Sequence, residues 1–152
     1  MKRIDAVVLG ATGYVGGEFL RLINAHPVFR LSAAVSGSRS GEHIGRIFPH
    51  LAAAYPQEVF ANPYSWLDEV DRGINLALFS AAPHGASAES IAAVLGLAEK
   101  RNLKVHIVDT SADFRFACVA DFESIYGVPH PKPRLLDDFF CAVPEHQEAP
   151  AA

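Results

Sequence analysis

Three glycines spaced three residues apart constrain the fold of this chain more than any other feature. Gly10, Gly13 and Gly16 follow Ile4–Leu9, a short apolar run rich in β-branched residues that predicts a buried strand. Apolar residues then recur at helical spacing and predict an amphipathic helix: Val15, Phe19, Leu22 and Ile23. The glycines therefore lie at a strand-to-helix turn, where nucleotide-binding α/β domains carry a glycine-rich loop.

Each glycine would serve a different purpose at such a turn. Gly10 would let the chain turn sharply off the strand, and Gly13 would leave room for a phosphate beside the helix N-terminus. There, unpaired N–H groups and the helix dipole favour an anion. Gly16 would let the helix lie close to the sheet. The loop predicts a dinucleotide site with these contacts: Gly10, Thr12, Gly13, Tyr14, Val15 and Gly16.

Strand and helix patterns alternate along the rest of the chain. Strands are predicted at Leu31–Val35, Leu76–Phe79 and Val105–Val108, and helices at Trp66–Val70 and Ser87–Arg101. The repeated strand–helix–strand units predict an α/β fold, a doubly wound, Rossmann-type, mostly parallel sheet with helices on both faces.

Local signals mark the ends of these elements. His26-Pro27 ends the first helix, and Ser87 is a good N-cap for the long helix. Arg46–Tyr64 contains three prolines and no clear periodicity, so it is predicted as a loop with a short strand at Glu58–Ala61.

Length, charge and cysteine content limit the possible functions. A chain of 152 residues suits a single domain, 1–152, with about 146–152 expected to be a disordered tail. A net charge of −4 without a basic block argues against nucleic acid or a membrane as partner, and no apolar stretch approaches the roughly 18 residues of a membrane span. Cys118 and Cys141 lack C-x-x-C spacing and fit the reducing cytoplasm, and the scattered histidines predict no metal site.

The second strand carries the signal for the type of dinucleotide. NAD-binding domains place an acidic residue there, about 20 residues after the glycines, to hold the ribose 2′-hydroxyl. This chain has no acid between Val35 and Gly41, but it has Ser36, Ser38 and Arg39. Hydroxyl and guanidinium donors suit a 2′-phosphate, so the expected cofactor is NADP; the alternative is a solvated loop that happens to hold an arginine.

The carboxyl ends of the later strands border the expected ligand crevice. Ser80 and Ala81 should lie against the adenosine or pyrophosphate, and His84 should either line the cleft or cap the next helix. Ser111 should lie near the nicotinamide end. Arg115 is expected either to contact an anionic substrate or to form a structural ion pair with Asp113.

The glycine pattern also occurs in the extended short-chain dehydrogenases and epimerases. Those enzymes need a Tyr-x-x-x-Lys pair, in which the lysine lowers the pKa of the tyrosine. None of the tyrosines here has a lysine four residues on: Tyr14, Tyr55, Tyr64 and Tyr126. That class is therefore not favoured.

Three later motifs carry a more specific resemblance. They are DTSADFR (Asp109–Arg115), YGVPHPKP (Tyr126–Pro133) and CAVPE (Cys141–Glu145), with further matches at PHG (Pro83–Gly85) and FPHL (Phe48–Leu51). From Ile4 to about Glu145 the chain resembles the N-acetyl-gamma-glutamyl-phosphate reductases of the semialdehyde dehydrogenase group. Aspartate-semialdehyde dehydrogenases resemble the first 40 residues comparably, but lack the pairing of SADFR with YG-x-x-HP.

The resemblance implies an NADP-dependent reduction of N-acetyl-gamma-glutamyl phosphate in arginine biosynthesis. In that family a cysteine thiolate attacks the acyl phosphate, phosphate leaves, and hydride from NADPH releases the semialdehyde. In that family the nucleophilic cysteine lies within an Asn-Pro-Gly-Cys segment, and the catalytic histidine comes much later, in a second domain. The second domain also carries the subunit contacts that make a homo-oligomer. This chain has neither residue, so it resembles the cofactor-binding half and is expected to be inactive alone.

Neither cysteine of the chain is expected to act as a nucleophile. Cys141 lies in an apolar, strand-like run and is predicted to be a buried, inert thiol; Cys118 is also predicted to be inert. The alternatives to a reductase of this substrate are the cofactor domain of an aspartate-semialdehyde dehydrogenase and a non-enzymatic NADP-binding sensor.

Overall fold

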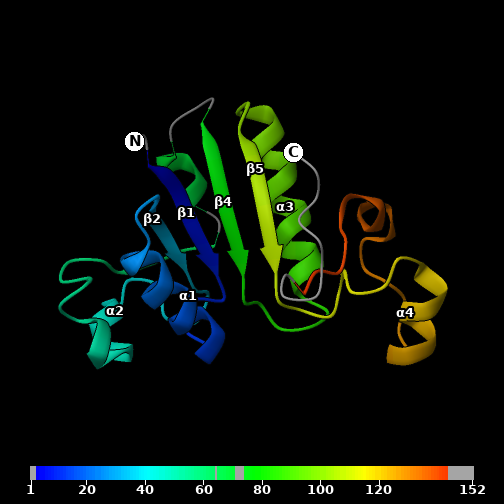
Figure 1. Cartoon of the computed structure of the whole chain (residues 1–152), viewed down its shortest axis with the longest axis horizontal. Helices are drawn as coiled ribbons and strands as arrows, with labels where there is room; N and C mark the ends of the chain where they lie inside the picture. Colours follow the sequence, from blue (N-terminus) through cyan, green and yellow to red (C-terminus); the bar gives the residue numbers. More distant parts are fainter. Residues whose placement is uncertain (1–2, 64, 71–73, 144–152) are drawn as a thin grey trace.

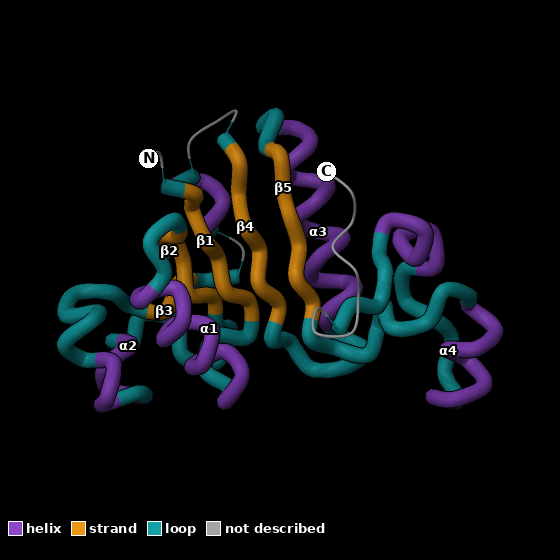
Figure 2. Tube along the Cα trace, in the orientation of Figure 1, coloured by secondary structure: helices purple, strands orange, loops and turns teal. Residues whose placement is uncertain are grey.

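A five-stranded, all-parallel sheet with the strand order β3-β2-β1-β4-β5 forms the centre of the protein (Figures 1 and 2). The computed structural model describes residues 3–63, 65–70 and 74–143; the predicted tail at 146–152 lies outside them. The strands are β1 (Ile4–Leu9), β2 (Phe29–Val35), β3 (Phe60–Ala61), β4 (Asn75–Ser80) and β5 (Lys104–Asp109). The prediction of a doubly wound, Rossmann-type parallel sheet is confirmed.

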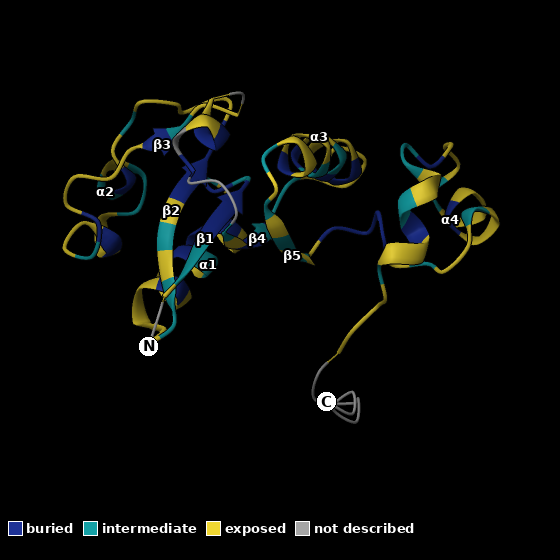
Figure 3. Ribbon diagram, turned by 90° about the horizontal axis from the view of Figure 1, so that it is seen from above, coloured by how far each residue is buried: buried dark blue, intermediate teal, exposed yellow. Residues whose placement is uncertain are grey.

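The two long helices lie on opposite faces of this sheet (Figure 3). The α-helices are α1 (Tyr14–Ala25), α2 (Ile44–Ile47), α3 (Ser87–Lys100) and α4 (Val119–Tyr126), and the 3-10 helices are η1 (Pro49–Leu51), η2 (Trp66–Glu69) and η3 (Pro133–Asp138). Helix α1 ends just before His26-Pro27, as predicted. Helix α4 stands away from the sheet, beyond β5 (Figure 1).

Alternation along β1 divides the core into two parts. Ala6 and Val8 pack with Leu20 of α1, while Val7 and Leu9 pack with residues of α3. This is the period of two that a strand buried on both faces requires. Because β1 pairs with both β2 and β4, its carboxyl end lies at the middle of the sheet edge.

The buried side of α1 differs from the predicted one. Val15 and Leu22 were expected to face the core but are 47% and 52% exposed. The buried stripe instead runs through Gly16, Gly17, Leu20 and Ile23. The cause is close packing, since a Cβ on Gly17 would lie 2.8 Å from the Phe48 ring. The spacing of large apolar residues gives no indication of glycines on the buried side of a helix.

The region predicted as a loop, Arg46–Tyr64, has more structure than expected. It contains the second half of α2 and all of η1, and the strand predicted at Glu58–Ala61 is reduced to β3. Tyr55 fixes this region to α1, because its buried hydroxyl donates a hydrogen bond to the Leu20 carbonyl oxygen at 2.7 Å. Helices α4 and η3 were not predicted either.

Strand β5 is covered on one face only within the described residues. Val105 and Ile107 pack toward the α3 side, whereas Lys104, His106 and Val108 point to the opposite face and are exposed. Helix α1 covers β1 and β2, but does not extend over this strand (Figure 1).

The stability of the fold should fall at high pH through Tyr55. Burial, and then the nearby Glu58 carboxylate, raises the pKa of Tyr55 from 10.0 to about 12. An unfolded tyrosine loses its proton near pH 10, so the stabilisation is complete below that pH and is lost as pH rises through 12. Denaturant unfolding should therefore show a loss on the order of 2 kcal/mol across this window that Tyr55→Phe lacks. Tyr14→Phe, at a 96% exposed site, should behave as wild type; an equal loss in Tyr55→Phe would contradict this assignment.

Candidate cofactor site

A cleft of about 590 Å³ opens at the carboxyl ends of β1, β2 and β4. This is the crevice in which open parallel sheets bind their ligands. Six residues predicted for the cofactor line it: Gly10, Thr12, Gly13, Ser36, Ser38 and Ala81. The glycine loop after β1, the loop after β2 and the loop after β4 thus meet at one site.

Gly10 allows these loops to approach one another. Its φ is +66°, and a Cβ there would lie 2.6 Å from the Ala81 carbonyl oxygen. Gly16 has a related role, because its Cβ would lie 2.6 Å from the Gly10 carbonyl oxygen. The predicted close approach of the helix is therefore present, and its partner is the glycine loop itself. Both positions exclude any side chain.

Gly13 borders an open helix N-terminus. It is the N-cap of α1, where the first turn contains no acidic residue and no side chain caps the helix. A Cβ at Gly13 would meet one atom within 4 Å, the Gly10 carbonyl oxygen at 3.6 Å. The backbone N–H groups of this turn and the helix dipole therefore face an accessible space that suits a phosphate. The residues present fit a dinucleotide.

The loop after β2 is connected to the glycine loop by hydroxyl groups. Thr12 Oγ1 and Ser36 Oγ lie 3.3 Å apart, and the Arg39 backbone N–H donates to Ser36 Oγ at 3.3 Å. The Arg39 guanidinium pairs with Glu42 at 3.1 Å and is about half exposed. Arg39 is not part of the lining of the cleft, although the preceding residue, Ser38, is.

The far wall of the cleft is apolar and was missed by the sequence analysis. Trp66 and Leu67 of η2 form part of it, together with Pro63, and α3 contributes Val94 and Leu97. Leu97 is 43% exposed on α3, a degree of exposure that only the structure reveals. Pro63 lies in a stretch without periodicity, so no pattern identified it.

Ser80 and Ser87 take part in a buried hydrogen-bond chain below the cleft. Ser87 Oγ donates to Asp109 Oδ1 at 2.8 Å, so Ser80 Oγ is the donor in its 2.6 Å contact with Ser87 Oγ. Both serines are 0% exposed. The predicted N-cap role of Ser87 is therefore wrong, since Ala86 is the N-cap and the Ser87 hydroxyl points to Asp109. Ser80 lies beneath the cleft and not in its lining.

The turn after β5 is held by its own polar groups. Ser111 Oγ donates to Asp109 Oδ2 at 2.6 Å and accepts the Asp113 N–H at 3.1 Å. Asp113 is 1% exposed, and its carboxylate accepts the N–H groups of Gly85 and Ala88 at 2.7 and 2.9 Å. Asp113 therefore caps the start of α3 from a distant loop. Ser111, like Ser80, has its hydroxyl group inside the structure.

His84 neither lines the cleft nor caps α3. Its Nδ1 accepts the Ala112 N–H at 2.8 Å, which ties the loop after β4 to the turn after β5. Tyr14 and Val15 are exposed at the start of α1, with Tyr14 96% exposed, and neither side chain lines the cleft. Sequence reasoning placed His84 at the correct edge but did not identify its partner.

Arg115 borders a second cavity, of about 690 Å³, beside the end of β5. The expected ion pair with Asp113 is absent from the ion pairs of the described residues, because the Asp113 carboxylate is occupied by backbone N–H groups. The Arg115 side chain is exposed. It is thus available to an anion at this cavity.

Cys141 also lines the second cavity, and its predicted burial is wrong. Phe139 stacks on Phe114 with ring centroids 3.9 Å apart, but Phe140 is 77% exposed and Cys141 is exposed. The physical reason is that 139–143 do not form a strand, so neighbours do not cover them on both faces. Cys118 is exposed as well.

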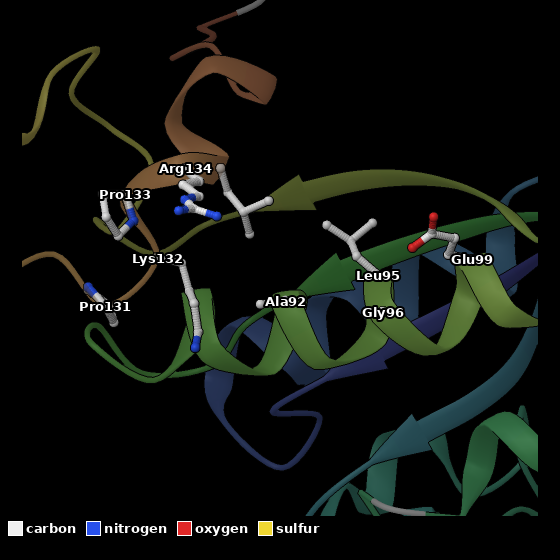
Figure 4. A pocket seen from close by; sticks show the side chains of 9 residues that line it. Ala92, Leu95, Gly96, Glu99, Pro131, Lys132, Pro133 and Arg134 are labelled. Carbon is white, nitrogen blue, oxygen red and sulfur yellow. The ribbon is translucent and has the colours of Figure 1, made fainter.

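A third hollow, of about 460 Å³, lies on the outer side of α3 (Figure 4). Lys132 and Arg134 reach it from the segment before and within η3, and Glu99 lies at its other end. It contains none of the glycine-loop residues, so it is separate from the cofactor cleft.

The glycine loop and the parallel sheet agree with the comparison with known families. The description "Semialdehyde dehydrogenase, NAD binding domain" matches residues 5–146. The chain belongs to the semialdehyde dehydrogenase family. The match covers the cofactor cleft and the second cavity, so both belong to the nucleotide-cofactor domain of this family.

Relatives within the semialdehyde dehydrogenase family carry two kinds of name. A LysW-L-2-aminoadipate/LysW-L-glutamate phosphate reductase of Aeropyrum pernix is 33% identical over 95% of this chain. N-acetyl-gamma-glutamyl-phosphate reductases of Methanopyrus kandleri and Ectopseudomonas mendocina are 36% and 34% identical over 91% and 93% of it. The chain spans 38% of the length of each of these relatives.

A solved structure shows the same fold. The crystal structure of aspartate semialdehyde dehydrogenase with NADP from Candida albicans matches 91% of this chain and 41% of its own, with a TM-score of 0.51 and 20% identity.

Neither a membrane-spanning helix nor a metal cluster is present in the part of the chain that the structure describes. None of the helices there has the length and apolar character needed to cross a bilayer. No group of three or more histidine, cysteine, aspartate or glutamate side chains in that part of the chain is arranged to hold a metal ion.

The buried serine chain should contribute measurably to stability. Ser87→Ala removes a hydrogen bond to the Asp109 carboxylate and leaves Ser80 without its acceptor, which should lower the free energy of unfolding by about 1.5–3 kcal/mol. Ser90→Ala is the control on the same helix, because its hydroxyl bonds the Ala86 carbonyl at an exposed site. Urea unfolding should show the smaller loss for Ser90→Ala; equal losses would refute a special role for the buried chain.

Proposed function

We propose that this chain, residues 1–152, is the NADP(H)-binding domain of an acyl-phosphate reductase that acts on N-acetyl-gamma-glutamyl phosphate. The observation that carries the proposal is the cleft at the uncapped N-terminus of α1, where Gly13 leaves room for a phosphate. When bound there, the cofactor supplies hydride. The substrate assignment rests on the motifs shared with the named relatives and on their identity to this chain.

The chain's own part in such a reaction is to bind and orient the dinucleotide. The proposed pyrophosphate contacts are the backbone N–H groups of Thr12 and of residues 14–16, with the Thr12 hydroxyl beside them. The Gly13 N–H is not among them, because it donates to the Gly10 carbonyl oxygen at 3.2 Å. The apolar wall that includes Trp66 and Leu97 is suited to exclude water from the flat adenine face. Ala81 lines the cleft between these two regions, with Ser80 buried beneath it.

Preference for NADP over NAD is proposed for the loop after β2. Ser36 and Ser38 line the cleft, and Arg39, the next residue along the chain, carries donors that suit a 2′-phosphate. Glu42 holds the Arg39 guanidinium at 3.1 Å. Since Glu42 would repel a phosphate, Arg39 has to exchange this exposed ion pair for the phosphate when NADP binds.

The second cavity is proposed as the substrate end of the site. Arg115 and Ser111 both line it, close to the carboxyl end of β5. A guanidinium without an acidic partner among the described ion pairs suits the phosphate of an acyl phosphate. The expectations that neither Cys118 nor Cys141 is the nucleophile, and that the chain alone has no reductase activity, stay predictions.

A second candidate substrate follows from the relatives. Phosphate reductases named for LysW-linked aminoadipate or glutamate are 33–38% identical to this chain, and those named for N-acetyl-gamma-glutamyl phosphate are 33–36% identical, so the two ranges overlap. Both names describe an acyl phosphate whose amino group is blocked. Either substrate would use the same cofactor cleft.

Cofactor preference is the first test. Calorimetry on the 152-residue chain should show tighter binding of NADPH than of NADH. Arg39→Ala should weaken NADPH binding about 5- to 100-fold and leave NADH binding unchanged, because it removes a charge-assisted contact to the 2′-phosphate. Arg46→Ala removes the same charge from a nearby site that is 79% exposed, and should change neither affinity. Equal wild-type affinities for the two cofactors would contradict the 2′-phosphate proposal.

The position of the pyrophosphate is the second test. Gly13→Val should abolish NADPH binding, because its side chain would occupy the space at the start of α1. The fold should persist, since Gly13 has φ −77° and ψ 170°, a conformation open to any residue. Gly96→Ala adds a methyl group to α3 where nothing lies within 4 Å, and should bind normally. Calorimetry with far-ultraviolet circular dichroism checks both; binding by a folded Gly13→Val would show that the phosphate lies elsewhere.

A further inference from the structure

His130 is buried, 5% exposed, and both of its ring nitrogens are used. Nε2 lies 2.6 Å from the Asp113 carbonyl oxygen, which can only accept, so Nε2 carries the proton. Nδ1 accepts the Lys132 N–H at 3.1 Å. The ring is therefore a neutral imidazole of one defined tautomer, with one hydrogen bond within its own turn and one across to the turn after β5.

Asp113, whose carbonyl oxygen accepts the hydrogen bond from His130, also contacts the start of α3. The Asp113 carboxylate accepts the N–H groups of Gly85 and Ala88, and the neighbouring Ala112 N–H donates to His84. Through Asp113, these hydrogen bonds connect the turn at Lys132 with the loop after β4. We name these residues the edge clamp: His84, Gly85, Ala88, Ala112, Asp113 and His130.

The edge clamp lies between the two cavities. Ala81, Ala82 and Pro83 line the cofactor cleft on one side, immediately before His84. Ser111 and Phe114 line the second cavity on the other side, and they flank Ala112 and Asp113. A shift of the turn after β5 would therefore move the walls of both cavities together.

We propose that His130 is a positioning residue, which fixes the turn after β5 and, through Asp113, the Ala81–Pro83 wall of the cofactor cleft. The inference rests on the proposed function, because it names the cleft as the place where the effect is measured. His130 also packs on Phe122 and Phe114, with ring centroids 4.6 and 5.9 Å away. Packing alone needs only an aromatic or apolar side chain, whereas the relay needs a donor that reaches the Asp113 carbonyl oxygen.

Two substitutions separate the two hydrogen bonds of His130. His130→Gln has an amide that can reach the Nε2 position, so it keeps a donor for Asp113. His130→Asn has an oxygen at the Nδ1 position, so it keeps the acceptor for the Lys132 N–H but is too short to reach Asp113. Both variants are polar and lose the aromatic contacts with Phe114 and Phe122. His106→Asn, at an exposed position on β5, is the control for loss of a histidine.

The experiment measures NADPH affinity by calorimetry and, without cofactor, the exchange rates of the Gly85, Ala88 and Ala112 amide protons by NMR. His130→Asn should weaken NADPH binding about three- to tenfold, as expected for one hydrogen bond, and should speed exchange at all three amides. His130→Gln and His106→Asn should stay within about twofold of wild type in both measurements.

Equal weakening by Asn and Gln would show that only packing matters and would overturn the proposal, as would an unchanged His130→Asn. If His130→Asn does not fold, His130→Gln decides, because affinity or exchange far from wild type in that variant would also overturn it. If wild type does not bind NADPH, the proposed function fails separately, and the amide exchange rates of the cofactor-free variants still decide whether His130 holds the edge clamp.

Discussion

The closeness of the glycine loop to the end of β4 is the constraint on which the site depends. A Cβ at Gly10 would lie 2.6 Å from the Ala81 carbonyl oxygen, so two backbones meet where any side chain would separate them. Backbone hydrogen bonds maintain this approach, with the Ala81 N–H donating to the Leu9 carbonyl and the Ala11 N–H donating to the Val35 carbonyl. Three strand ends are thereby held together, and the start of α1 opens into the space between them.

Much of the fold could be predicted because its signals are local. The β-branched run of β1, the glycine spacing and the stop at His26-Pro27 each act within a few residues, and the structure agrees with them. The prediction fails where the stabilising partner is distant in sequence. The buried stripe of α1 includes Gly17 because Phe48 packs on it, and α2 and η1 form in a proline-containing stretch whose Tyr55 bonds to Leu20.

In the candidate site, too, the positions of residues could be predicted from local signals, but their partners could not. Gly10, Gly13, Ser36 and Ser38 follow the ends of β1 and β2 and line the cleft, since parallel strands end at one edge, whereas Ser80 and Ser111 do not line it. What each polar group binds could not be read from the sequence. Ser87 looks like an N-cap, yet it donates to Asp109, and the carboxylate that does hold the start of α3 belongs to Asp113, 25 residues from Ala88. No local pattern contains such pairings, because they arise only when β4 and β5 lie side by side.

Parallel pairing also dictates the order in which this chain can gain its structure. A β-hairpin can form from neighbouring residues, but here each strand must first close a long loop before its ladder begins, which slows folding. The strands β1 and β2 with α1 can associate when the first third of the chain is available, since Ile4 pairs with Phe29. The contacts of Gly10 with Ala81 and Ala82 wait for β4 to join β1, where Asp5 pairs with Leu76. The glycine loop is thus translated among the first residues, but it reaches its final shape only when β4, from the middle of the chain, has paired with β1.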